Sequence, residues 1–387
     1  MTEIVAVHTD HADAAAAAAH LAEQINTALS APPDAIVLFA SSSFDYAVLL
    51  ETLTTQCRPG VLVGASSAGE FTHAHHGTGT ASALAFRSDD LVVAAGLGQG
   101  ISTDSRAAAR DIVANFQGMQ GTRYRYRAAL VMTDALAGHA EDFVEEMTLR
   151  TSGRYLLAGG GAGDDANFSR THVFFGTRTY TDAAVALEFL SDKPIGVGVG
   201  HGWEPAGVPL RATEVDGMTV VGFNGLPAVE AFERHAEATG QQFDRGKPLP
   251  FFLHNILGVD GGDGYRLRVP LAIDADGGVH CAAEIPEQAR VFIMKTTDAS
   301  AAIAAARATQ AAVGALGEHR PGAAVFFDCV ATRLRLGDGF GFELEMVAQA
   351  LAGAPFVGCN TYGQIARSDS QFSGFHNCTA VVLALPA

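Results

Sequence analysis

Residues 61–71 read VLVGASSAGEF, an apolar run that breaks into a turn of small residues. The pattern returns twice, as LLAGGGAGDD at residues 156–165 and as FVGCNTYGQI at residues 356–365. A short apolar run bounded by glycine is typical of a buried strand that ends in a turn, because glycine accepts backbone angles that other residues avoid. The sequence therefore predicts three equivalent strand ends, which we call the glycine turns.

Each glycine turn lies between two further strand candidates. Upstream of each turn is an apolar run followed by a polar turn and a helix-like segment, at residues 35–40, 128–132 and 324–328. Downstream is an alternating run, at residues 81–97, 172–190 and 372–385. The pattern predicts an α/β fold of two domains built on mixed sheets, in which one strand–helix–strand–turn–strand unit is used three times.

The material between the second and third units has no counterpart elsewhere in the chain, so a stacked repeat array is not expected. Residues 103–116 are predicted to form a linker helix before the second unit, and residues 211–223 a hairpin that turns at Asp216-Gly217. The polar, proline-containing stretch at residues 241–250 is the preferred domain boundary. We therefore divide the chain into domains of residues 1–245 and 246–387.

Composition excludes several classes of protein. Of the 387 residues, 48% are hydrophobic and 17% are charged, which is typical of a protein with a large core and not of a disordered chain. The formal net charge of −17 would repel phosphate backbones and anionic membrane surfaces. Nucleic acid is therefore not an expected partner.

The cysteines and the N-terminus indicate the compartment. The five cysteines are odd in number and scattered, which favours reduced thiols over a disulfide framework. The N-terminal stretch MTEIVAVHTD has neither the basic nor the apolar region of a secretion signal. Since no apolar run approaches the roughly 18 to 20 residues of a membrane helix, we expect a soluble cytoplasmic protein without membrane insertion.

Several stretches, in one order, resemble the FIST proteins, which are bacterial signal-transduction sensors with FIST-N and FIST-C domains. The stretches are GASSAGEF (64–71), GGGAGDD (159–165), THVFFGTRTYTDAAVALEF (171–189), GHGWEPAGVPLRATEVDGMTVVGFNGLPAVEAF (200–232), VGCNTYGQI (357–365) and FHNCTAVVLAL (375–385). The resemblance covers roughly residues 30–385. It implies a FIST-N-like sensory domain and a FIST-C-like domain that bind a small molecule and inform a partner. It transfers no catalytic residues, so we expect no enzyme.

A subset of free-standing FIST proteins binds haem, senses nitric oxide and controls a separate histidine kinase. The chain resembles this subset in its length and in the absence of an attached output domain. What the resemblance implies is a haem b cofactor and a histidine kinase partner. Because the sequence lacks C-x-x-C-H, the haem would be held non-covalently.

The glycine turns supply most of the candidate ligand contacts. Small residues at a strand end allow backbone N–H groups to face a ligand, although tight chain reversal with close packing explains the turns equally well. Glu70, Asp164 and Gln364 occupy nearly equivalent positions, where they could bind a ligand ammonium or each other's backbone. The candidates from the turns are Gly64, Ser66, Ser67, Glu70, Gly160, Asp164, Asn360, Tyr362 and Gln364.

A pair of arginines offers a second kind of contact. Arg266 and Arg268, in GYRLRVPL, alternate with apolar residues and would share one side of a strand. Such a pair could hold a ligand carboxylate through bidentate hydrogen bonds, whereas a solvated strand face is the simpler explanation. An amino acid or related metabolite is therefore the alternative ligand to haem.

Histidines in apolar surroundings are the candidates for an axial haem ligand. They are His201, His254 and His376, and for each of them a hydrogen-bonded core histidine is the commoner structure. The cluster of His73, His75 and His76 is more typical of a polar loop than of a zinc site, so no metal other than haem iron is expected.

An enzyme that uses cysteine and histidine is the least favoured alternative. His376 and Cys378 would share one face of a strand, because they are two residues apart. A catalytic thiolate would need that histidine within hydrogen-bond reach.

Overall fold

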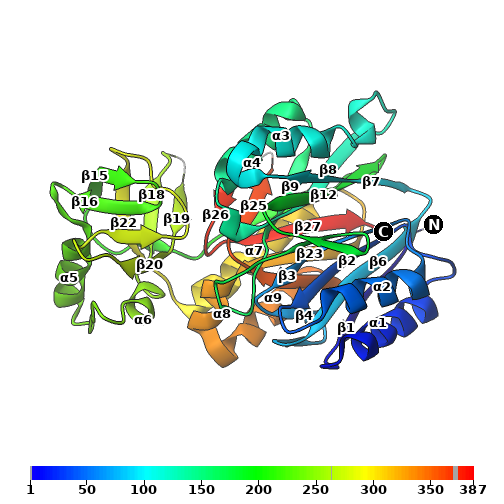
Figure 1. The fold of residues 1–387 in the computed structure, drawn as a ribbon, viewed down its shortest axis with the longest axis horizontal. Coiled ribbons are helices and arrows are strands. Elements are labelled where there is room, and N and C mark those ends of the chain that lie inside the picture. The colour runs from blue at the N-terminus through cyan, green and yellow to red at the C-terminus, as the bar shows by residue number, and fades with distance from the viewer. Residues whose placement is uncertain (1, 263, 369–373) are drawn as a thin grey trace.

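Three six-stranded sheets form the larger body of the molecule, and a separate sheet forms a smaller body beside it (Figure 1). The computed structural model describes residues 2–262, 264–368 and 374–387. Within them the protein is mixed α/β, as predicted, and each of the three six-stranded sheets contains strands from distant parts of the sequence. We call the larger part the three-sheet body.

The first sheet is built by the N-terminal unit. Its central strands β2 (Ala35–Ser41) and β3 (Val61–Ser67) are parallel and joined by helix α2 (Tyr46–Cys57). Strand β6 (Ala81–Ser88) pairs antiparallel with the other edge of β2, and β1 (Thr2–Thr9) pairs with β6. Helix α1 (Ala14–Ala28), whose N-cap Asp13 accepts a hydrogen bond from Ala16 N at 2.8 Å, joins β1 to β2.

The second and third sheets repeat this order with their own elements. The second sheet comprises β7 (Leu91–Gln99), α3 (Ile101–Val113), β8 (Tyr126–Thr133), α4 (Ala140–Arg150), β9 (Leu156–Gly161) and β12 (Ala183–Ser191). The third comprises β13 (Gly196–Gly200), α7 (Asp298–Gly314), β23 (Pro321–Cys329), α8 (Val330–Leu336), α9 (Phe340–Ala350), β24 (Phe356–Thr361) and β27 (Ala380–Pro386). Short 3₁₀ turns lie at Gln117–Met119, Ala135–Ala137 and Gly337–Gly339.

After its glycine turn, each unit sends a hairpin into the sheet of another unit. The hairpins are β4 (Glu70–Thr72) with β5 (His76–Gly77), β10 (Val173–Phe175) with β11 (Arg178–Tyr180), and β25 (Gln364–Arg367) with β26 (Gly374–His376). Strand β4 pairs with β24 of the third unit, β10 with β3 of the first, and β25 with β9 of the second. The exchange is cyclic, because each unit gives one hairpin and receives one. Backbone hydrogen bonds therefore join all three units.

The three sheets share one core. Buried side chains from all three meet in a single apolar cluster, and ring contacts bridge the sheets, with centroids 5.6 Å apart for Phe39 and Phe327 and 5.8 Å for Phe86 and Phe189. The opposite faces of the sheets pack against the helices. Burial on both faces explains why the central strands are continuously apolar.

The predicted repeat is therefore confirmed, but the true unit is longer than predicted. Residues 81–97 form two strands in two different sheets, because the Ser88 hydroxyl accepts hydrogen bonds from Asp90 N and Leu91 N and closes a bend. The alternation of residues continues through this bend, so the sequence alone shows a single run. The predicted linker helix at residues 103–116 is α3, the equivalent of α1 and α7. Of the run at residues 372–385, the first two residues lie outside the described part of the chain.

Residues 204–295 form the smaller body, which we call the insert because it interrupts the third unit between β13 and α7 (Figure 1). Its elements are β14 (Glu204–Pro205), β15 (Leu210–Asp216), β16 (Thr219–Phe223), β17 (Leu226–Pro227), α5 (Ala228–Thr239), α6 (Leu249–Phe252), β18 (Leu257–Asp260), β19 (Tyr265–Arg268), β20 (Pro270–Ile273), β21 (Val279–Cys281) and β22 (Arg290–Lys295). The predicted hairpin is formed by β15 and β16, with Asp216 opposite Thr219.

The insert enters and leaves the three-sheet body at one place, because β14 pairs with β22 and Glu204 lies opposite Lys295. The proposed domain boundary between residues 245 and 246 lies between α5 and α6, and it stays a prediction. In the part of the chain that the structure describes, no helix combines the length and apolar character needed to cross a membrane.

Glu70 and Gln364, at equivalent positions in their units, make equivalent contacts. Each side chain joins the glycine turn to the residue just before the last strand of its unit. Gln364 donates to Thr361 Oγ1 at 2.8 Å and accepts from Thr379 N at 3.2 Å, just before β27. Glu70 accepts a hydrogen bond from Ser67 Oγ and another from Thr80 Oγ1 at 2.7 Å, just before β6. Burial raises the pKa of Glu70 to about 7, although hydrogen bonds from Ser67 and Thr80 oppose the shift.

A Gly64→Ala substitution should destabilise the fold. A Cβ atom at Gly64 would lie 1.9 Å from the backbone oxygen of Leu38 on the neighbouring strand, so β2 and β3 would have to separate. We expect a loss of about 2 to 3 kcal/mol in the free energy of unfolding, or no folded protein. Gly314→Ala is the control, because no atom lies within 4 Å of a Cβ there. Urea denaturation that gave both variants the wild-type midpoint would contradict this packing.

A Glu70→Gln substitution should remove a pH dependence of stability. Because the folded-state pKa of about 7 lies above the ordinary value of 4.5, the stabilising contribution of protonated Glu70 is complete below pH 4.5 and is lost as the pH rises through 7. Relative to wild type, the variant should therefore gain on the order of 3 kcal/mol between pH 4.5 and 8. Gln364→Glu should introduce the same dependence, and a constant difference between Glu70→Gln and wild type across this range would argue against the raised pKa.

Candidate ligand site

The three glycine turns meet and hydrogen-bond to one another through their backbones. The donor and acceptor pairs are Ala68 N to Asn360 O, Gly163 N to Ser66 O and Tyr362 N to Gly161 O, at 2.9, 2.9 and 3.0 Å. The turns thus come together as a group, at the carboxyl ends of the parallel strand pairs. Much of their hydrogen-bonding capacity is used within the protein.

Two of the predicted ligand contacts in the turns are glycines that lie inside strands. Gly64 is opposite Leu38 in the parallel pair of β3 and β2. Gly160 is opposite Gln364, and a Cβ atom there would lie 2.8 Å from the backbone oxygen of Gly363. Close approach of backbones explains both glycines. A ligand contact at either one stays a prediction.

Most of the polar turn residues are hydrogen-bonded within the protein. The Ser66 hydroxyl accepts from His172 N at 2.9 Å, and Ser67 donates to Glu70. Asp164 is buried and accepts from Phe168 N, Ser169 N and Arg170 N at 2.8, 2.7 and 2.9 Å, and from the Tyr362 hydroxyl. Burial opposes ionisation of Asp164, but hydrogen bonds from Tyr362, Arg170 and Ser169 hold its pKa below the ordinary value. These side chains stabilise the turns.

Asn360 differs from the other turn residues. Its side chain is completely buried, yet within the described chain neither of its amide atoms has a hydrogen-bond partner. The Nε atom of Arg333 is likewise without a partner there, and both atoms lie beside Gly69, where a Cβ atom would be 2.8 Å from Asn360 Oδ1 and 3.2 Å from Arg333 Nε. Asn360 thus has unused capacity to bind a polar atom.

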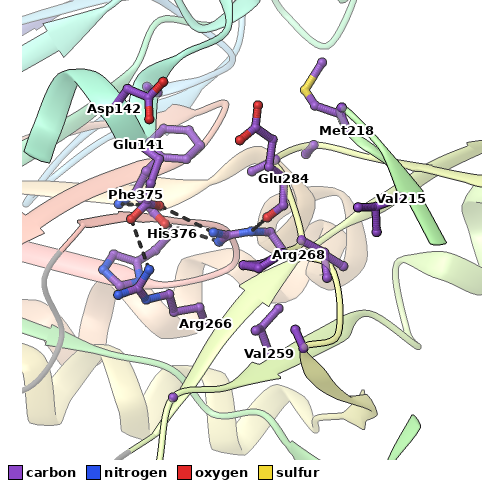
Figure 2. Close-up of a pocket in the computed structure, with 18 of the residues that line it drawn as sticks. Glu141, Asp142, Val215, Met218, Val259, Arg266, Arg268, Glu284, Phe375 and His376 are labelled. Carbon is purple, nitrogen blue, oxygen red and sulfur yellow. Dashed lines mark hydrogen bonds and ion pairs between the residues drawn. The ribbon is translucent and has the colours of Figure 1, made fainter. Parts of the chain in front are cut away.

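A cavity of about 850 Å³ lies between the start of α4 and the insert. This volume is within the range of small-molecule sites. Figure 2 shows the predicted residues Arg266, Arg268 and His376 together on its wall, with Glu141 and Phe375 beside them. The structure therefore joins the arginine pair, predicted from one strand, to a histidine more than a hundred residues away.

The two arginines share one carboxylate. Arg266 Nη1 lies 3.2 Å from Glu141 Oε1, and Arg268 Nη2 lies 3.4 Å from Glu141 Oε2. Arg268 is buried and also donates to three backbone oxygens, those of Glu284, Leu267 and Phe375, at 2.7, 3.0 and 3.2 Å. Arg266 is 49% exposed, so it is the member of the pair that can bind a ligand with least rearrangement.

Further carboxylates line the same cavity. They are Asp142, Asp260, Glu284 and Glu287. Figure 2 shows the carboxyl groups of Asp142 and Glu284 on the side of the cavity away from Arg266. Of the carboxylates that Figure 2 labels, Glu141 therefore lies with the arginines, and Asp142 and Glu284 lie away from Arg266. Sequence reasoning missed Glu141 and Asp142, because acidic residues in the first turn of a helix are common for reasons of the helix dipole alone.

The three candidate haem ligands have different surroundings. His376 is buried on the cavity wall, where burial and the charges of Arg268 and Arg266 lower its pKa to about 3. His201 lies at the root of the insert, with Nε2 3.2 Å from Tyr265 O and Nδ1 3.3 Å from Trp203 N. His254 is exposed. Among the described residues, no group of three or more His, Cys, Asp or Glu side chains could hold a metal ion.

A second cavity, of about 480 Å³, adjoins the first and is mainly apolar. Both cavities are lined by residues 135 and 138–139 of the loop after β8 and by residues 217–218 of the insert. The wall of the second cavity includes Leu253 and Leu271 of the insert and Val330 and Tyr362 of the three-sheet body. The carboxyl ends of strands are where α/β folds usually bind ligands. Tyr362 is the glycine-turn residue that the structure places on a cavity wall.

Comparisons with known proteins give a family and two weak structural likenesses. The family model of the FIST N domain matches residues 34–226, and that of the FIST C domain matches residues 228–367. No curated protein matches the chain. The crystal structure of cyanuric acid hydrolase from A. caulinodans is 10% identical, with 100% of this chain and 99% of that chain covered and a TM-score of 0.35. T. maritima PurL complexed with ATP is 13% identical, with coverages of 99% and 71% and a TM-score of 0.21.

One expectation from the sequence is corrected by these comparisons. We expected no enzyme, but a solved structure that the chain matches over its whole length is an enzyme, the hydrolase. The exclusion of catalysis is therefore withdrawn, although a likeness at a TM-score of 0.35 carries no argument for any particular reaction.

The two family models together span residues 34–367 with a gap of one residue. The chain therefore belongs to the FIST family, whose domains are signal-transduction sensors that bind small ligands.

Proposed function

We propose that the sensed ligand binds in the 850 Å³ cavity and carries a carboxylate, and that it is an amino acid or a related metabolite. The observation that supports this proposal is the ion pair of Glu141 with Arg266 and Arg268. Glu141 belongs to the three-sheet body and the arginines belong to the insert. A protein carboxylate thus already occupies the position that a ligand carboxylate would take.

The mechanism is competition for the arginines. A ligand carboxylate that pairs with Arg266 displaces Glu141 and removes an ionic contact between the insert and α4. Arg266 is half-exposed, so its guanidinium can turn towards the cavity without leaving the insert surface. The ligand then favours one arrangement of the two bodies over the other, which is the differential affinity that a signal requires.

The carboxylates on the far side of the cavity complete the match to an amino acid. Asp142 and Glu284 lie across from Arg266, where they can pair with a ligand ammonium. A zwitterionic ligand would pair its carboxylate with Arg266 and its ammonium with Asp142 or Glu284. A simple anion would leave these two carboxylates without a partner. This difference favours an amino acid over an acid without an amino group.

Haem b, with nitric oxide as the signal, is the second candidate, and His376 is the observation that favours it. Its imidazole is buried on the cavity wall and its lowered pKa of about 3 keeps it neutral, as ligation of iron requires. Arg266 and Arg268 beside it are suited to pair with the propionates. The residues that would hold haem are therefore His376 at the iron and Arg266 and Arg268 at the propionates. When bound, haem would supply the iron to which nitric oxide coordinates.

We further propose that the output is control of a partner histidine kinase in the cytoplasm. All five cysteines are free and buried, which is consistent with a reducing compartment. The partner would read the position of the insert relative to the three-sheet body.

The first test is calorimetric titration of the protein with the standard L-amino acids, each compared with its amide. We expect one or a few amino acids to bind and the amides to bind at least tenfold more weakly, because they lack the carboxylate. The Arg266→Ala variant should bind the amino acid at least tenfold more weakly than the wild-type protein does. Glu141→Gln should bind more tightly, since the competing carboxylate is gone.

Arg245→Ala is the matched control, because Arg245 pairs with Glu233 on the insert outside the cavity, at 2.7 Å. Equal binding by Arg266→Ala and Arg245→Ala would refute the site, and binding by no amino acid would refute the ligand class. Identical small-angle scattering with and without a bound amino acid would contradict the change in arrangement.

The haem candidate is tested by titration with hemin, followed by absorbance. We expect a Soret band shifted towards a histidine-ligated species, and its loss in His376→Ala. His254→Ala, at an exposed position, should keep the wild-type spectrum. An unshifted Soret band in the wild-type protein, or the same spectrum in His376→Ala, would rule out ligation by His376.

A further inference from the structure

Two of the five cysteines lie together where the insert joins the three-sheet body. Cys329 is the last residue of β23, and Cys378 lies in the turn between β26 and β27. Both thiols are free and belong to one packed cluster that also contains Trp203 and Val269. The backbone of Cys378 has a φ of 48°, so the strand alternation predicted to place it beside His376 ends before it. Its neighbour is Cys329.

A chain of hydrogen bonds fixes the backbone on both sides of the pair. Thr361 Oγ1 donates to Asp328 O at 3.2 Å and accepts from Gln364 Nε2 at 2.8 Å. Gln364 Oε1 accepts from Thr379 N at 3.2 Å. Asp328 precedes Cys329 in the chain and Thr379 follows Cys378. The two cysteines are therefore held together by the same contacts that close the third unit.

Cys329 is also one of the residues that line the apolar cavity of about 480 Å³, and it is 3% exposed. Hydrogen bonding from the Cys378 thiol, against the opposing effect of burial, lowers the pKa of Cys329 to about 7. By contrast, burial raises the pKa of Cys57 to about 11 and that of Cys281 to about 12. Thiolates and not thiols are the reactive form. Cys329 thus combines a lowered pKa with a place on a cavity wall.

We propose that Cys329 and Cys378 are a redox-active pair, in which an organic hydroperoxide entering the apolar cavity oxidises Cys329 and Cys378 completes a disulfide. The Cys329 thiolate sulfur attacks the terminal peroxide oxygen, the O–O bond breaks, and the alkoxide takes a proton and leaves as an alcohol. The Cys378 sulfur then attacks the sulfenic acid, the S–O bond breaks, and the thiol proton leaves with the hydroxide as water. The hydroperoxide gains two electrons and the two thiols lose them.

The disulfide would form beside contacts that hold the insert. Asn377 Oδ1 accepts from Val269 N at 3.3 Å, and Phe375 O accepts from Arg268 at 3.2 Å. Any movement of the turn at residues 377–379 therefore reaches β19 and the arginines. This inference is independent of the ligand proposal, since it needs neither an amino acid nor haem.

The test treats the reduced, full-length protein with cumene hydroperoxide at neutral pH. We expect the intact mass to fall by two hydrogen atoms, dithiothreitol to restore it, and peptide mapping to show a link between Cys329 and Cys378. Cys378→Ser should instead stop at the sulfenic acid and form an adduct with dimedone. Cys329→Ser should not react under the same conditions.

Cys57→Ser is the matched control, because Cys57 is also buried but its pKa is raised, and this variant should form the disulfide as wild type does. Circular dichroism before treatment confirms that each variant is folded. The peptide map of the wild-type protein tests the link between the two cysteines even if a variant does not fold. An unchanged wild-type mass, or a link that does not join Cys329 and Cys378, would overturn the proposal.

Discussion

The fold depends on the exchange of hairpins between the three sheets. Each of the strands β3, β9 and β24 would be an open sheet edge if its unit stood alone, and unpaired edges invite association with other chains. The hairpin of another unit covers each edge through backbone hydrogen bonds. The glycine turns are the points from which these hairpins depart, which is why small residues recur there.

Much of this architecture could be predicted from sequence, because the signals are local. The apolar runs identified the central strands, and the threefold recurrence identified the unit. The hairpin exchange could not be predicted, because β4 and its partner β24 lie at opposite ends of the chain and short strands carry little pattern of their own. The division of residues 81–97 between two sheets was also hidden, since both strands alternate in the same way.

Prediction of the candidate site from the sequence met the same limit, because its residues come from distant segments. Arg266 and Arg268 were recognisable from their spacing on a strand, and His376 from its apolar surroundings. Their meeting with Glu141 depends on how the insert packs against α4, which no sequence spacing records. Glycine-turn residues such as Ser67 and Asp164, which also attracted attention in the sequence, use their side chains to stabilise the turns. Cys329 and Cys378 were both visible in the sequence, but only the closure of the third unit makes them neighbours.

The pairing of β14 with β22 has a consequence for the history of such proteins. Because the insert leaves and rejoins the three-sheet body at adjacent residues, its ends span almost no distance. A segment with neighbouring ends can be lengthened, shortened or exchanged while the surrounding strand order is kept. The three sheets and their exchanged hairpins can therefore stay constant while the insert, which supplies most of the residues that line the 850 Å³ cavity, diverges. A change confined to one contiguous stretch of the gene is then enough to alter most of the cavity wall.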